Sequence, residues 1–163
     1  MFVKKDILML LKKGVSMEFP FEMITDVDKV ENVHYIEVKP VKYNAKYWNK
    51  ESVYFANESF AYFYTTICKY MPQYQPTKVT EIKAETGLRI SNQLQELAYF
   101  LSSTPPMIKL NKWIDFDKVE ETYKQFNRHK NKYIRELINM INEFTAWVTK
   151  VCQTQTYINI LDT

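Results

Sequence analysis

The sequence predicts an α+β fold: a mostly helical single domain with a small antiparallel sheet and a long C-terminal helix. Three patterns support this. Apolar residues recur every seven positions in the last third, β-branched and aromatic residues gather in the first third, and the stretches between have helical spacing. Because 163 residues with 46% hydrophobic content suffice for one well-packed core and not for two, we expect residues 1–163 to form one domain.

The first third combines a short helix with the strands of the sheet. Residues 3–13 carry apolar side chains on one side and stop at Gly14, which predicts an amphipathic helix. Residues 17–24 alternate, and residues 33–43 are rich in β-branched and aromatic side chains, so each predicts a strand. The acidic segment 25–28 predicts the turn between them.

The middle of the chain predicts helices. Residues 49–71 lack Pro and Gly and have apolar residues at helical spacing, so they predict one helix. Residues 79–86 and 90–103 predict two more, separated at Gly87. A short strand is expected at residues 107–110.

The longest predicted element begins at Asp115 or Asp117 and covers roughly 33 residues, about 50 Å at the rise of an α-helix. Lys130 falls on its apolar side, which predicts a bend or break within residues 127–131. The β-prone tail, residues 156–161, predicts an edge strand. The seven-residue spacing rests on Val119, Phe126, Tyr133, Met140 and Trp147.

The composition argues against catalysis. Gly14 and Gly87 are the only glycines, whereas phosphate-binding loops, dinucleotide fingerprints and nucleophile elbows all require glycine where the backbone approaches a ligand or turns sharply. Neither His34 nor His129 has an Asp, Ser or Cys at a catalytic spacing, and Glu58 lacks a second carboxylate. We therefore expect no enzyme and no cofactor.

The acidic residues and the cysteines indicate neither a metal site nor export. Asp26, Asp28 and Glu31 lack the glycine and terminal glutamate of a calcium loop, so we expect a solvated turn and no bound metal. Cys68 and Cys152 have no metal-binding or redox spacing and are expected to be reduced thiols. With no apolar run near the roughly 20 residues of a membrane span, we expect a cytoplasmic protein that does not contact membranes.

Two surfaces are candidates for binding a protein partner. The helix predicted at 49–71 carries more rings than one buried face can hold, so either it is covered on two sides or part of it forms a partner surface. Residues 124–135 contain cations without an acid among them. The cations fall within roughly 80° of each other on a helical wheel, so they predict a basic stripe, which either contacts a partner or is a solvated helix face. The candidate residues are Tyr54, Tyr62 and Tyr70 on the first surface, and Lys124, Arg128, Lys132 and Arg135 on the second.

Residues 79–101 resemble a helix-turn-helix, with Ile82 in a first helix, Gly87 at the turn and a polar start to a second helix. The resemblance implies that side chains of the second helix read bases in a major groove. The chain departs from the motif where small or apolar residues are expected, so an ordinary helical hairpin stays open as the alternative. The implied base-reading residues are Arg89, Asn92, Gln93 and Gln95.

These observations favour a non-catalytic protein-binding protein: an inhibitor of the immunity type that neutralises a partner toxin, or an adaptor. The alternative is a DNA-binding regulator that uses residues 79–101 and binds phosphates through the basic stripe. A homodimer formed through the seven-residue spacing of the long helix is a further alternative.

Overall fold

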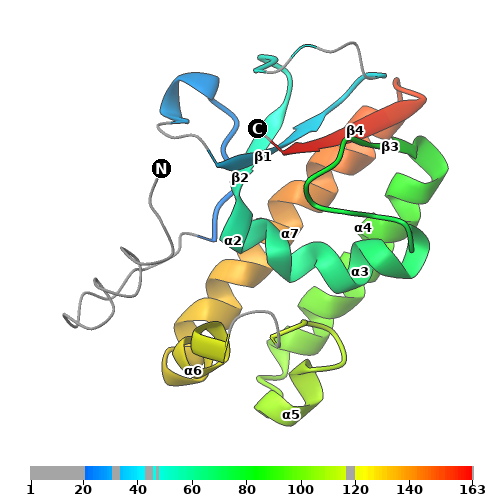
Figure 1. The fold of residues 1–163 in the computed structure, drawn as a ribbon. Helices are drawn as coiled ribbons and strands as arrows, with labels where there is room; N and C mark the ends of the chain where they lie inside the picture. The colour runs from blue at the N-terminus through cyan, green and yellow to red at the C-terminus, as the bar shows by residue number, and fades with distance from the viewer. Residues whose placement is uncertain (1–20, 31–33, 43–45, 47, 117–119, 163) are drawn as a thin grey trace.

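The computed structural model describes residues 21–30, 34–42, 46, 48–116 and 120–162 of the chain. They form a four-stranded antiparallel sheet with helices gathered on one of its faces (Figure 1). The predicted α+β fold, mostly helical with a long helix near the C-terminal end, is confirmed. The helix expected at residues 3–13 lies outside the described residues.

The sheet has the order β2 (Val53–Ala56), β1 (Tyr35–Lys39), β4 (Tyr157–Asp162) and β3 (Thr80–Lys83), with every neighbouring pair antiparallel. The strand expected within 33–43 is confirmed by β1. The tail also forms a strand, but the expectation of an edge position is wrong, because β4 lies between β1 and β3. Both faces of β4 are buried, which fits a central position.

The N-terminal strand expectation is met only in part. Residues 17–20 lie outside the described residues, and within 21–24 only Ile24 pairs, through two hydrogen bonds of 2.8 Å with the backbone of Tyr54. The acidic segment that follows forms the expected turn, a 3-10 turn at Val27–Lys29 in which the Asp26 carboxylate accepts from the Asp28 N–H.

The single helix expected at residues 49–71 is wrong. Residues 49–52 precede β2, and the strand is followed by α2 (Asn57–Phe60), a 3-10 turn and α3 (Tyr64–Tyr70). The run Val53-Tyr54-Phe55 has helical spacing with the residues after it, yet all three side chains have high strand propensity. Pairing with β1 buries all three side chains on the two faces of the sheet, whereas one helix face cannot bury three consecutive residues, so the sheet decides their conformation.

The two helices expected around Gly87 are also wrong. Residues 80–83 are strand β3, and one continuous helix, α4 (Ala84–Ser102), contains Gly87 in its second turn. Gly87 is buried against β4, where an added Cβ would lie 3.2 Å from the Cδ1 of Ile158. The glycine therefore permits close packing of helix on strand and ends no helix, so the helix-turn-helix geometry is absent from residues 80–101.

The strand expected at residues 107–110 is a short helix, α5 (Met107–Leu110), which buries Met107 and Leu110 one turn apart. The long helix is divided at His129 into α6 (Glu120–Arg128) and α7 (Lys130–Cys152). The break predicted within residues 127–131 is thus confirmed. Because the helix is interrupted at His129, the apolar face of α7 need not continue that of α6. Lys130 therefore does not have to enter the core.

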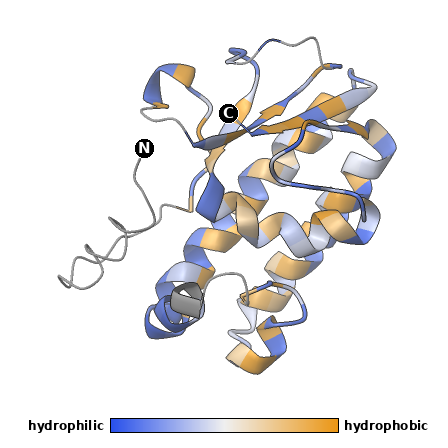
Figure 2. Ribbon diagram, in the orientation of Figure 1, coloured by the Kyte–Doolittle hydropathy of each residue, from blue (hydrophilic) through white to orange (hydrophobic). Residues whose placement is uncertain are grey.

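One hydrophobic core joins the sheet to the helices, and α4 packs along α7 across it. Hydrophobic residues recur along the sheet and along the helices that cover it (Figure 2). Aromatic rings fill its centre: Phe144 of α7 stacks on Phe63 at 5.3 Å between ring centroids and meets Phe55 of β2 edge-on at 5.2 Å. None of the helices in the described part of the chain is long and apolar enough to cross a membrane.

Substituting Gly87 with leucine is expected to destabilise the fold by about 1–3 kcal/mol, because the new side chain overpacks the contact between α4 and β4. The free energy of unfolding, measured by urea denaturation, tests this. Arg89→Leu is the matched control, since Arg89 lies on the exposed side of the same helix. Equal stability of the two variants would contradict the close packing at Gly87.

Alkaline pH is expected to destabilise the protein partly through Tyr62. Burial, and then the neighbouring Tyr133, raises the pKa of the Tyr62 hydroxyl well above its usual value. Above about pH 10 the unfolded chain loses this proton while the folded chain keeps it, so the stabilising contribution, complete below pH 10, is lost as pH rises further.

Above about pH 10, the unfolding free energy of the parent should therefore decline more steeply with pH than that of Tyr62→Phe. The two slopes should differ by up to about 1.4 kcal/mol per pH unit. Urea denaturation of both proteins at pH 9, 10 and 11 measures the two slopes. Parallel slopes would contradict the burial of the Tyr62 hydroxyl.

Candidate functional site

The described residues contain no group of three or more His, Cys, Asp or Glu side chains that is arranged to hold a metal ion. His34, His129 and Glu58 are exposed. The Cys152 thiol is less reactive than an exposed thiol, because burial raises its pKa and lowers the fraction of thiolate.

Buried polar side chains lie instead on the sheet face opposite the helices, here called the outer face. In β1, Ile36 and Val38 point into the core, so Glu37 and Lys39 point outward, and both are fully buried. Tyr54 of β2 pairs with Glu37 and Asn159 of β4 pairs with Lys39, which places all four side chains on this face.

Glu37 holds the chain that returns to β2. Its carboxylate accepts hydrogen bonds from the N–H of Trp48 at 2.9 Å, from the N–H of Asn49 at 3.1 Å and from the Ser52 hydroxyl at 2.6 Å. The Tyr54 hydroxyl donates to the carbonyl of Asn49 at 2.7 Å. Burial, followed by the negative charge of Glu37, raises the pKa of Tyr54, so this hydroxyl keeps its proton as a donor.

Lys39 and Asn159 hold the earlier part of the same connection. The Lys39 ammonium donates to the carbonyl of Lys46 at 2.9 Å, and the Asn159 side-chain amide donates to the carbonyl of Val41. These are contacts of side chain with backbone, which position a loop and leave little room for a substrate. The polar cluster therefore has a structural role.

The structure separates the three predicted partner-facing tyrosines. Tyr54 is completely buried on the outer face, and Tyr62 is buried among Phe21, Phe116 and Phe126 in the core. The expectation that these two rings form an exposed surface is wrong. The two residues belong to different elements rather than to one helix, and each ring is buried in a different part of the fold. Tyr70 is half-buried in α3, beside Lys69.

The basic stripe is divided between two helices. Lys124 and Arg128 belong to α6, whereas Lys132 and Arg135 belong to α7, beyond the break at His129. Lys124, Arg128 and Arg135 are exposed, while Lys132 is half-buried and lies 4.0 Å from the Glu136 carboxylate. The four cations thus do not share one helix face.

Two of the four implied base-reading residues hold helices together. Gln93 is buried, accepts from the Lys69 ammonium and from the Tyr70 hydroxyl at 3.3 Å, and so links α4 to α3. Gln95 donates to the Thr145 hydroxyl of α7. Asn92 is exposed, and Arg89 is exposed in an ion pair of 2.7 Å with Glu85.

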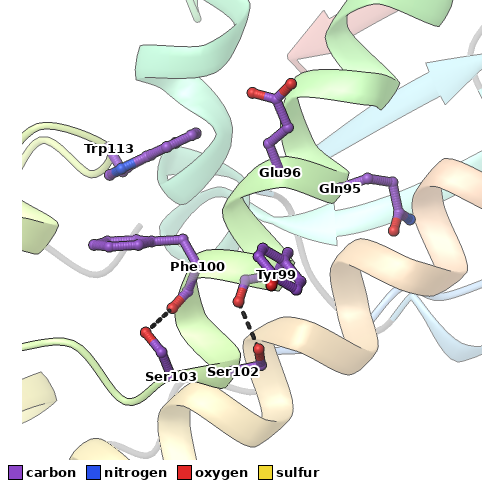
Figure 3. A pocket seen from close by; sticks show the side chains of 7 residues that line it. All are labelled: Gln95, Glu96, Tyr99, Phe100, Ser102, Ser103 and Trp113. Atoms are coloured by element: carbon purple, nitrogen blue, oxygen red, sulfur yellow. Dashed lines mark hydrogen bonds between the residues drawn. The ribbon is translucent and has the colours of Figure 1, made fainter.

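An open groove of about 580 Å³ lies along the C-terminal half of α4, next to the segment that follows α5 (Figure 3). Phe100 and Trp113 stack with 5.7 Å between their ring centroids, and the Tyr99 side chain is 84% exposed. Among the described residues that line it, Glu96 is the only charged side chain. These lining residues are Gln95, Glu96, Tyr99, Phe100, Ser102, Ser103 and Trp113.

The ends of the groove are held by short local hydrogen bonds. The Ser102 hydroxyl donates to the carbonyl of Tyr99 at 2.5 Å, and the Ser103 hydroxyl donates to the carbonyl of Phe100 at 2.7 Å (Figure 3). The Phe100 carbonyl also accepts from the Ser103 N–H at 3.2 Å, so side-chain and backbone donors together satisfy carbonyls of the last turn of α4. The rings of Tyr99 and Phe100 are therefore presented on a fixed helix end, whereas Trp113 comes from the segment after α5.

Sequence reasoning missed this groove. The pair Tyr99-Phe100 at the end of an amphipathic helix was a usable signal, because adjacent positions differ by 100° and one helix face cannot bury both rings. The contribution of Trp113 had no sequence signal, since its approach to Phe100 depends on the path of the chain through α5.

Comparisons of the chain with protein-family models, with curated proteins and with solved structures find no match.

Replacing Glu37 with glutamine is expected to lower the unfolding free energy by about 3 kcal/mol, because three donors lose a charged acceptor and the new, buried amide group adds donors among them. Urea denaturation measures this, with exposed Glu51→Gln as the control expected to stay within about 0.5 kcal/mol of the parent. Indistinguishable variants would show that Glu37 does not fix the loop.

Proposed function

We propose that this chain is a non-catalytic protein-binding protein that contacts its partner through the groove at the end of α4. The observation that carries the proposal is the highly exposed Tyr99 beside the stacked pair Phe100 and Trp113. Tyrosine and tryptophan are enriched in the residues that dominate binding energy at protein interfaces. The buried charged side chains of β1, Glu37 and Lys39, hold the backbone of a loop instead, which supports binding over catalysis.

The lining favours a partner that inserts a lysine or arginine. The rings of Tyr99, Phe100 and Trp113 offer apolar and π surfaces on which the stem of a long cationic side chain packs. The Glu96 carboxylate, which accepts from the Gln93 side chain at 3.1 Å, retains further acceptor capacity for the cation. Charge and shape thus complement a basic side chain on the partner surface.

The proposal covers both an inhibitor of the immunity type, which neutralises a toxin, and an adaptor, because both act by covering a partner surface. Exposed Ile108 on α5, a helix that lies at the end of α4, extends the apolar area at this end of the molecule (Figure 1). The cations of α6 and α7 are a second contact region for the same partner. Self-association is the remaining alternative, and sedimentation of the purified chain distinguishes it.

Tyr99→Ala is expected to abolish capture of the partner, because it removes the most exposed ring of the groove and leaves the core unchanged. The measurement compares tagged parent and variant as baits in nuclease-treated lysate of the native host, by quantitative mass spectrometry of stoichiometric proteins. Glu96→Lys should have the same effect through charge reversal.

Leu88→Ala is the matched control, since Leu88 is an exposed apolar residue near the other end of α4. A protein retained by the parent and by Leu88→Ala, and lost from both groove variants, supports the proposal. Equal retention by all four baits would contradict it.

A further inference from the structure

A second exposed aromatic residue lies on the opposite part of the fold, on the connection between β1 and β2. Of this connection the structure describes residues 40–42, 46 and 48–52, here called the strap. Its contacts with Glu37, Lys39 and Asn159 fasten it over the outer face of the sheet. The strap is thus a surface layer with a rigid support of buried polar side chains beneath it.

Trp48 is held in the strap at a conformational cost. Its φ of 61° lies in the left-handed region, which is rare for a bulky residue. Such a strained backbone conformation raises the free energy of the folded chain. The hydrogen bond from its N–H to Glu37 fixes the backbone, and its indole stacks on the buried Tyr54 ring at 5.7 Å and 19°. The side chain nevertheless remains 43% exposed.

This combination points to binding rather than to packing. Burying the indole in the core would give more stability than leaving it half in solvent. Instead, a buried carboxylate and a buried tyrosine hold a large ring in place at the surface, which reduces the conformational entropy that a ligand contact would have to overcome. Strained residues of this kind occur at binding sites.

Lysines recur along the strap that carries Trp48 and on the sheet edge beyond it. Lys42, Lys46 and Lys50 of the strap are exposed, and the Lys42 ammonium lies 5.8 Å from the centre of the Tyr157 ring. Lys83 of β3 is also exposed on the outer face, since its neighbour in the sheet is Tyr157. Against these four lysines, the exposed carboxylates of the strap and of β3 are those of Glu51 and Glu81.

We propose that the strap binds single-stranded nucleic acid, with a base stacked on Trp48 and phosphates neutralised by Lys42, Lys46 and Lys50. Spaced cations along a backbone track together with an aromatic ring for a base are the features that sequence-tolerant single-strand binding requires. This inference is independent of the proposed protein-binding function and uses none of the residues of the groove.

Two other anionic ligands fit less well. Duplex DNA is read by a helix or a two-stranded ribbon inserted into a groove, and the described part of the strap forms neither. The carboxylates of an acidic peptide can pair with the lysines, but they offer no flat ring that could stack on the indole. A single strand uses both the charge and the ring, so it is the ligand that the arrangement favours.

The test is fluorescence anisotropy of fluorescein-labelled dT20 and rU20 titrated with the full chain between 50 and 200 mM salt. The three lysines predict a slope of log affinity against log salt near −2, from about 0.7 per phosphate contact. Trp48→Leu is expected to weaken binding about tenfold, the loss of one stacked base, while Trp48→Phe restores most of it. Lys42→Ala combined with Lys50→Ala should reduce the slope by about 1.4.

Matched controls lie away from the strap. Leu88→Ala removes another exposed apolar side chain, and Lys109→Ala combined with Lys112→Ala removes two exposed lysines around α5, so both should bind as the parent does. Thermal unfolding monitors the fold of each variant.

Absence of saturable binding at 50 mM salt, or equal binding by the parent and Trp48→Leu, would overturn the proposal. The proposal would also be overturned if the same concentration of polyglutamate displaced the oligonucleotide from the parent and from Trp48→Leu. That result would show that charge alone attracts the oligonucleotide. These results concern Trp48 and do not depend on the outcome of partner capture with the Tyr99 variant.

Discussion

The rest of the structure depends on the position of β4 between β1 and β3. This strand, from the C-terminal end of the described chain, pairs with β1 on one edge and with β3 on the other. Without it, β1–β2 and β3 would be separate pieces with open edges. The inner side chains of β4, Ile158 and Ile160, also belong to the core, and Ile158 meets α4 where Gly87 allows the helix to approach. Assembly of the sheet and packing of the helix on it are therefore coupled through one strand.

The two faces of the sheet are buried by different means. Helices α4 and α7 cover the inner face with apolar and aromatic side chains, and the burial of this area drives folding without directional requirements. The outer face is covered by a loop, whose backbone N–H and C=O groups need partners once water is excluded. Glu37, Lys39 and Asn159 supply those partners, which explains why charged residues occupy the interior of β1.

The exposed rings follow from the same architecture. The C-terminal end of α4 lies near α5, away from the sheet (Figure 1). Tyr99 and Phe100 belong to this end of α4 and Trp113 stacks on Phe100, whereas Trp48 belongs to the loop that covers the sheet. One surface is neutral to acidic through Glu96, and the other is basic through the lysines of the strap. A partner complementary to one surface is thus a poor match for the other, so the two proposals concern different ligands.

The sequence by itself determined the fold class, the strand at β1, the strand nature of the tail and the break in the long helix, because each depends on local propensity and periodicity. It did not determine whether residues 53–56 and 80–83 join the sheet, since their side chains have helical spacing with their neighbours and only β1 and β4 supply the pairing. The role of Gly87 was ambiguous for the same reason, because a glycine can either end a helix or allow another element to pack closely against it. The position of Ile158 beside it shows that the second role applies. The exposure of Tyr54, Tyr62, Tyr99 and Trp48 was likewise a tertiary outcome, because a ring is buried or exposed according to which distant segment packs over it.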